Sequence, residues 1–125
     1  MTNKVLTAEE DEMVKNCAGF AFEKKAYDLI SLDLRGISPV ADYFLICSGN
    51  NVQQVKAICD NIDDKMEEQL GLKPLRIEGY RDAHWILMDY GTLIVHIFLG
   101  DEREFYSLER LWGDAPAYKY EPKTE

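Results

Sequence analysis

Cysteine is scarce in this sequence, and its three copies do not form the spacing of a disulfide framework or a metal site. Cys17, Cys47 and Cys59 are an odd number, and no two of them form a C-x-x-C pair. Each stands in an apolar run, where a thiol serves as a small core side chain. We therefore expect neither a disulfide-bonded secreted fold nor a cysteine-based metal or redox centre.

Long apolar runs are also missing, because no stretch approaches the roughly 20 residues that a membrane-spanning helix needs. The N-terminus lacks the basic-then-apolar pattern of a secretory signal. It is also acidic from Glu9 to Glu12, which is not typical of an organelle transit peptide. These absences predict a cytoplasmic protein that does not enter a membrane.

Positive charge is in short supply, with 14 Lys and Arg against 23 Asp and Glu and a formal net charge of −9. Tight binding to bare nucleic acid or to anionic lipid needs a cationic surface, so this balance opposes both. It suits a basic protein partner. Composition alone favours the simpler explanation that the acidity serves solubility.

What the sequence does contain is a regular succession of helix and strand signals in a chain of 125 residues, which is the size of one domain. A first helix begins after the Thr7–Glu10 capping box, and a second runs from Asn51, with Gln54 placed to return a capping bond, to Gly71. Strands are expected at 29–34, 43–47, 75–78, 85–89 and 93–99, and a last helix opens at Asp101.

This order, αββαβββα, predicts a single α/β domain over residues 1–114, with a mixed five-stranded sheet and helices packed on it. Strand 75–78 is expected to pair in parallel with strand 43–47, because a helical crossover fits the connection between them. Residues 115–125, with two prolines and mixed charge, are expected to form a flexible tail. The acidic side of the second helix is expected to be a solvated face.

Catalytic signals are weak. The sequence has two histidines, and His96 lies inside the apolar strand 93–99, where a packed residue with one satisfied hydrogen bond is the favoured interpretation. His84 has no metal-ligand spacing to it. There is no P-loop, dinucleotide fingerprint or H-E-x-x-H pattern. We therefore predict no catalytic residue, no metal site and no cofactor.

One enzymatic alternative depends on the turn at 47–50, which joins a strand to a helix where α/β proteins often hold phosphate. Nucleotidyltransferases of this architecture pair a glycine–serine turn with two aspartates on the next strand, which hold two divalent metals. Strand 75–78 has no such aspartates, and Asp60, Asp63 and Asp64 belong to a helix face. The sequence predicts a nucleotidyltransferase-like architecture without its active site.

Aromatic and charged residues gather in the C-terminal half instead. Trp85 opens a strand, Tyr90 stands at the following turn, and Arg103, Tyr106 and Glu109 lie on the polar side of the last expected helix. Trp, Tyr and Arg often anchor protein interfaces, because they bury much area and keep a polar group. For Trp85 a core role is as reasonable as an interface role, whereas Trp112, on the apolar stripe, is expected in the core.

The same region carries a family resemblance. The matching stretches are Asp42–Asn50, Gln54–Val55, Ala57–Ile58, Glu78–Gly79, Trp85–Gly91, Val95–Phe98 and the pattern Arg103-x-x-Tyr106-x-Leu108-Glu109-x-Leu111-Trp112. Together, from about Ala8 to Asp114, they closely resemble the ribosomal silencing factor family, also called RsfS or Iojap-like. Several separated motifs in the right order make a chance similarity improbable.

The resemblance implies a protein that binds the large ribosomal subunit through a basic ribosomal protein on its intersubunit face. It would block association with the small subunit and repress translation when nutrients are limiting. Organellar relatives act in large-subunit assembly, so an assembly factor with the same docking site is the first alternative and a nucleotidyltransferase-like enzyme the second. Whether the free protein forms a homodimer stays open.

The resemblance also implies which residues dock. Trp85 and Tyr90 lie in the family's partner-contacting strand and hairpin and are the first choice. Further candidates are Leu87, Asp89 and His96 on adjacent strands and Arg103, Tyr106 and Glu109 on the last helix, which alternatively brace that helix on the sheet. Thr92 stands where family members often have an acidic residue after the glycine, which weakens any requirement for charge at that turn.

Overall fold

The structure, a computed structural model, describes residues 8–100 and 115–120. In chain order its elements are α1 (Ala8–Phe22), β1 (Tyr27–Asp33), β2 (Tyr43–Gly49), α2 (Val52–Leu70), β3 (Arg76–Glu78), β4 (Trp85–Asp89), β5 (Leu93–Leu99) and β6 (Ala117–Lys119). The five expected strands are all present, with small shifts at their ends. The helix expected from Asp101, which carries Arg103, Tyr106, Glu109 and Trp112, lies outside the described residues.

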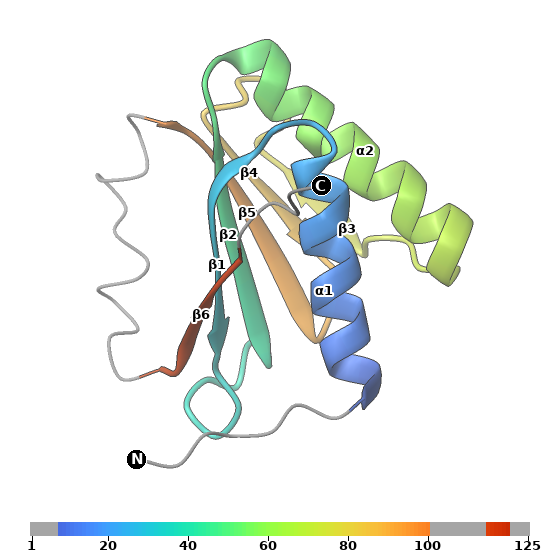
Figure 1. Ribbon diagram of the computed structural model, residues 1–125, viewed down its shortest axis with the longest axis vertical. Coiled ribbons are helices and arrows are strands. Elements are labelled where there is room, and N and C mark those ends of the chain that lie inside the picture. Colours follow the sequence, from blue (N-terminus) through green and yellow to red (C-terminus); the bar gives the residue numbers. More distant parts are fainter. Residues whose placement is uncertain (1–7, 101–114, 121–125) are drawn as a thin grey trace.

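The described strands form one sheet in the order β3-β4-β5-β2-β1-β6 (Figure 1). β2 and β5 are parallel, and every other neighbouring pair is antiparallel. The sheet is therefore mixed, as predicted, within a single α/β domain. It has six strands, however, and not the five that the sequence predicts.

The partner predicted for strand 75–78 is wrong. β3 pairs antiparallel with β4, with Arg76 opposite Asp89, and it is β5 that lies parallel to β2. The crossover through α2 therefore exists, but the chain passes through the β3–β4 hairpin before it reaches β5. β3 is only three residues long, and its two outer residues are exposed, which suits an edge strand and not a central one.

The sixth strand lies in the segment 115–125, for which the sequence predicts a flexible tail. Residues 117–119 pair antiparallel with residues 30–32 of β1. Their side chains are all exposed, so no alternation of apolar and polar residues marks this strand in the sequence. Pro116 immediately before it makes the strand harder to predict from the sequence. Proline argues against a central strand and is found at the first residues of strands and in edge strands.

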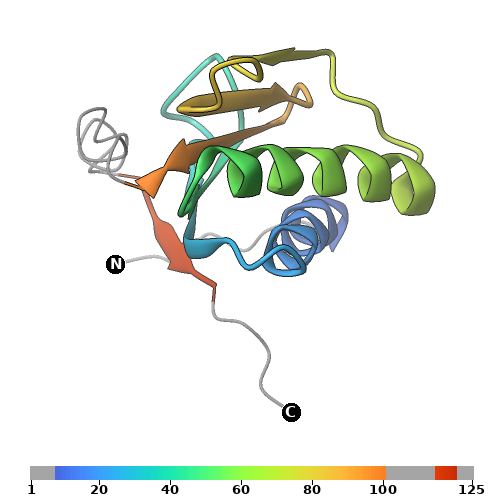
Figure 2. The same cartoon turned by 90° about the horizontal axis from the view of Figure 1, so that it is seen from above.

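Both described helices lie on one face of the sheet, called here the inner face (Figure 2). α2 is capped as predicted: Asn51 Oδ1 accepts the Gln54 backbone N–H at 2.8 Å, and Gly71 follows the helix with a φ of 67°. The buried residues of α2 are Val55, Ile58, Cys59, Ile62 and Met66. On its opposite side Asp60, Asp64, Glu67 and Glu68 are exposed and Asp63 is partly buried, which agrees with a largely solvated face.

The opposite, outer face of the sheet carries a second apolar cluster. Its buried members in the strands are Leu32, Phe44, Ile46, Ile94 and Phe98. They come from β1, β2 and β5, and Trp85 and Leu87 of β4 pack against them as partly buried neighbours. Ile30 of β1 also borders the cluster, so partly exposed side chains adjoin it at both β1 and β4.

Candidate interaction surface

Three of the predicted docking residues lie in a row on the outer face. Trp85, Leu87 and Asp89 alternate along β4, so their side chains point to the same side of the sheet. All three are partly buried, whereas Ile86 and Met88 between them are fully buried in the core of the inner face. We call Trp85, Leu87 and Asp89 the β4 strip.

The first residue of the strip is held by a hydrogen bond from its ring. Trp85 Nε1–H donates to Nδ1 of His96 on the neighbouring strand β5, and the two nitrogen atoms are 3.0 Å apart. The indole also stacks on Phe98, with ring centroids 5.2 Å apart and an angle of 24° between the ring planes. Trp85 is therefore neither a pure core residue nor a loosely attached surface residue.

His96 itself is 3% exposed, so it lies beneath the surface and not on it. Burial lowers the pKa of its imidazole to about 4, so the ring is neutral at physiological pH. Because Nδ1 accepts the indole N–H, the single ring proton belongs on Nε2, which is buried and finds no hydrogen-bond partner among the described residues. The packed, singly bonded histidine predicted from the sequence is confirmed.

Asp89 at the other end of the strip shapes the following turn. Its Oδ1 accepts the backbone N–H of Gly91 at 2.8 Å, and its Oδ2 lies 3.3 Å from Nε of Arg76. Arg76 also reaches Glu78 Oε2 at 3.1 Å and is 60% exposed, so water screens both ion pairs. The candidate list from the sequence did not include Arg76 and Glu78, although a β3–β4 hairpin places both of them beside the strip.

Tyr90 is not part of this row. Its ring packs against the core of the inner face, and burial raises the pKa of its hydroxyl above the ordinary value. The hydroxyl is buried and has no hydrogen-bond partner among residues 8–100 and 115–120. Alternation along the strand already places Tyr90 with Ile86 and Met88, and this signal separates it from Trp85.

The strip depends on a tight loop between β3 and β4. Gly79 has a φ of 80°, and a Cβ atom there would overlap the carbonyl oxygen of Trp85. Ala83 is buried with a φ of 58°, a conformation that costs free energy for any residue except glycine. Its N–H donates to the Gly79 carbonyl at 2.9 Å and closes the loop. The loop thus fixes where β4 begins.

At the turn that would hold phosphate in an enzyme, one backbone donor is already hydrogen-bonded within the protein. The backbone N–H of Asn50 donates to Gln54 Oε1 at 2.6 Å. Gln54 Nε2 in turn donates to the carbonyls of Lys24 and Lys25, at 3.1 and 2.9 Å. The side chain expected to cap its own helix therefore bonds one residue earlier than predicted and ties α2 to the turn that follows α1.

Two further residues of this turn serve packing. A Cβ atom at Gly49 would lie 3.0 Å from Val55 Cγ2, so glycine allows α2 to approach the end of β2. Ser48 is 1% exposed. Its hydroxyl is therefore not presented to solvent as a reacting group would be.

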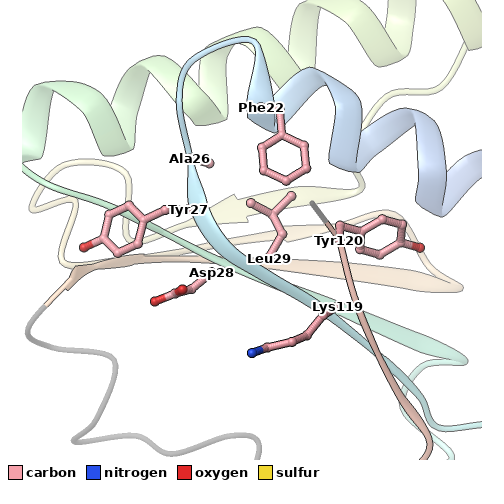
Figure 3. A pocket seen from close by; sticks show the side chains of 7 residues that line it. All are labelled: Phe22, Ala26, Tyr27, Asp28, Leu29, Lys119 and Tyr120. Carbon is pink, nitrogen blue, oxygen red and sulfur yellow. The ribbon is translucent and has the colours of Figure 1, made fainter. Parts of the chain in front are cut away.

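A cavity of about 260 Å³ lies at the opposite edge of the sheet, beside β1 and β6. Asp28, with a φ of 52°, lies within the register shift between Tyr27 and Ile30 and lines this cavity. Figure 3 shows Phe22, Leu29 and Tyr120 on one side of this space and the charged groups of Asp28 and Lys119 on the other. β5 and β2 lie between β4 and the strands that line the cavity, so the cavity is separate from the β4 strip.

The cysteines of this chain lie in the core of the inner face. All three cysteines are free and buried, as predicted, and burial raises the pKa of the Cys59 thiol to about 12. Within residues 8–100 and 115–120, no cluster of three or more His, Cys, Asp or Glu is placed to hold a metal ion. Neither α1 nor α2, the helices that the structure describes, is long and apolar enough to cross a membrane.

Known proteins resemble this chain in sequence and in fold. Residues 7–125 match the sequence model of the family described as "Ribosomal silencing factor during starvation". The chain is 47% identical to Ribosomal silencing factor RsfS of Bacillus subtilis over 107 residues, which cover 86% of this chain and 90% of that protein. It is 29% identical to the mouse protein "Mitochondrial assembly of ribosomal large subunit protein 1", over 72% of this chain and 40% of that one.

The fold agrees with these similarities. The structure superposes on a crystal structure of a Chromobacterium violaceum protein with a TM-score of 0.79 and 27% sequence identity, over 90% of this chain and 89% of that one. Sequence and fold thus point the same way over nearly the whole chain, and the chain belongs to the ribosomal silencing factor family.

Proposed function

We propose that the protein is a cytoplasmic ribosomal silencing factor that binds the large ribosomal subunit on its intersubunit face. Occupying that face blocks association with the small subunit and represses translation when nutrients are limiting. Membership of the family carries this proposal, because the similarity covers most of the chain. The mechanism is steric, so it needs no catalytic group and no cofactor.

The β4 strip is the docking surface in this proposal. Its residues are partly exposed on the face that neither α1 nor α2 covers. Tryptophan is among the residues most enriched at the energetic centres of protein interfaces, which favours Trp85 as the anchor. The formal net charge of −9 complements a basic ribosomal protein. Complementary charge speeds encounter and rejects wrong partners more than it tightens binding.

Two measurements test the proposal. Purified protein is sedimented with purified large subunits through a sucrose gradient, and subunit joining is then followed by adding small subunits. We expect the protein to sediment with the large subunit and to lower the yield of joined ribosomes in proportion to its occupancy. Absence of cosedimentation, or normal joining at full occupancy, contradicts the proposal.

An assembly role with the same docking site is the second candidate, and the name of the mouse relative favours it. An assembly factor is needed most during rapid growth, whereas a silencer is needed mainly in starvation. A deletion strain that accumulates precursor large subunits in rich medium supports assembly. Normal subunit profiles in rich medium, together with unrestrained translation in starvation, support silencing.

The enzymatic alternative has less support. The Asn50 N–H that would meet a phosphate is bonded to Gln54, and Ser48 is buried. Titration of the protein with a nucleoside triphosphate and Mg²⁺ in a calorimeter tests this alternative. We expect no heat of specific binding.

A further inference from the structure

The single polar atom of the Trp85 side chain is turned toward the protein. An indole has one hydrogen-bonding group, the Nε1–H, and here it is donated to His96 Nδ1 at 3.0 Å. Trp85 can therefore present only carbon surface to a partner. A docked side chain that meets this ring must be apolar or cationic, because carbon surface and ring electrons attract those groups.

His96 is well suited to fix the position of that bond. It lies at the centre of β5, directly opposite Leu87 of β4 and Ile46 of β2. Phe44 meets its ring edge to face with centroids 4.5 Å apart, and the ring is buried. A buried side chain packed from several sides has little rotational freedom, so its Nδ1 is a fixed acceptor.

The hydrogen bond to His96 limits the conformational freedom of the Trp85 side chain before a partner docks. A partly exposed tryptophan without an internal bond can turn about its two side-chain torsions, and that freedom is lost when a partner binds. An anchor already held in its bound orientation loses less entropy and binds more tightly. The bond to His96 supplies this restraint from below the surface.

We propose that His96 is a positioning residue of the docking surface: it makes no contact with the partner but holds the Trp85 indole in the orientation that docks. This inference rests on the proposed function and adds to it the chemistry that meets Trp85, an apolar or cationic side chain and not a hydrogen-bond acceptor. His96 thus belongs beneath the interface, as its packed position in the sequence favours, although the family resemblance also lists it among the candidate contacts.

A pair of variants with the same branching at Cγ tests the proposal. His96→Asn keeps an acceptor oxygen near the position of Nδ1, whereas His96→Leu has the same branched shape and no acceptor. We expect His96→Leu to weaken binding to purified large subunits about tenfold, the upper range for one hydrogen bond, and His96→Asn to recover most of that loss. A purely structural histidine predicts that both variants lose equally, and that result overturns the proposal.

A double-mutant cycle keeps the test valid if either histidine variant is destabilised. Trp85→Phe removes the indole donor but leaves a ring, so His96→Leu should weaken binding in the wild-type background and hardly at all in the Trp85→Phe background. Additive losses contradict a positioning role. The indole N–H resonance of Trp85, identified by its absence in Trp85→Phe, should be protected from exchange in wild type and His96→Asn and lose protection in His96→Leu.

These outcomes separate the two proposals. If wild-type protein does not bind large subunits at all, the proposed function fails, while the indole resonance still reports whether His96 holds Trp85. If wild type binds and the cycle is additive, the positioning role fails alone.

Discussion

Trp85 is the first residue of β4 and Tyr90 directly follows the strand, yet their side chains lie on opposite faces of the sheet. Trp85 packs on the outer cluster, and Tyr90 packs into the core beneath the helices. The family resemblance predicts both as aromatic anchors of one docking surface. In the structure, Trp85 shares the outer face with Leu87 and Asp89, whereas Tyr90 packs against the core of the inner face.

The first prediction contrasts these two residues in binding. Trp85→Ala should lower affinity for the large subunit by about 2 kcal/mol, as truncation of an aromatic anchor does. Tyr90→Phe should leave affinity unchanged, because the hydroxyl it removes is buried on the other face. Both affinities can be measured by titration of labelled protein with purified subunits. A loss of binding in Tyr90→Phe with normal stability would show that Tyr90 reaches the partner.

The same tyrosine gives a prediction for stability. A buried hydroxyl without a partner costs free energy, so Tyr90→Phe should leave the free energy of unfolding unchanged or raise it by about 1 kcal/mol. Urea unfolding followed by circular dichroism measures the change. Destabilisation by more than about 1 kcal/mol would mean that the hydroxyl is hydrogen-bonded in the folded protein.

Stability should fall in mild acid because of His96. Its pKa is lowered from 6.5 to about 4 in the folded protein. At a pH between these two values, His96 is therefore protonated in the unfolded chain and neutral in the folded protein. The free energy of unfolding therefore decreases as the pH falls through this window, by on the order of 3 kcal/mol in all.

Carboxylates also titrate near the lower end of that window and contribute to the loss of stability in acid. The contribution of His96 is therefore isolated by comparing variants with the wild type. Urea unfolding from about pH 7 to about pH 4.5 should show a shallower acid dependence in His96→Leu than in wild type. His84→Gln, which changes the exposed histidine, serves as the matched control. Equal slopes in wild type and His96→Leu would refute the assignment to His96.

The loop that positions β4 should tolerate no side chain at Gly79. Gly79→Ala places a Cβ against the Trp85 carbonyl and forces alanine to a φ of 80°, so we expect a loss of about 3 kcal/mol in unfolding free energy. Gly71→Ala is the control, because its φ is 67° but nothing lies within 4 Å of the added Cβ. It should cost only the conformational strain, about 1 kcal/mol. Similar losses in both variants would indicate that the loop relaxes around the new atom.

Local patterns explain why the sequence predicts most elements correctly. The cap at Asn51, the left-handed Gly71 and the apolar stripe between them depend on neighbouring residues, and all are found. β2 is buried at every position, as its continuous apolar run predicts. Such features are encoded within a few residues of where they act.

The errors concern relations between distant segments. The pairing partner of β3 depends on where β4 lies in the sheet. The three residues of β3 carry no sequence pattern that favours pairing with β4 over pairing with β2. Residues 117–119 form a strand because the edge of β1 offers hydrogen bonds, while their own side chains remain exposed. The bond from Trp85 to His96 requires the register of β4 on β5, which alternation alone does not fix.

Gln54 should be the most sensitive polar residue of α2. Its amide accepts from Asn50 N–H and donates to the Lys24 and Lys25 carbonyls, so Gln54→Ala should lower the free energy of unfolding by about 1–2 kcal/mol. Gln54→Glu keeps the acceptor but replaces the donor with a carboxylate facing two carbonyls, and should be at least as destabilised. Gln53→Ala, at an exposed neighbouring position, should change stability by less than about 0.5 kcal/mol. If Gln54→Glu is as stable as wild type, then the bonds to the turn that follows α1 contribute nothing, and the junction of the two helices depends on apolar packing alone.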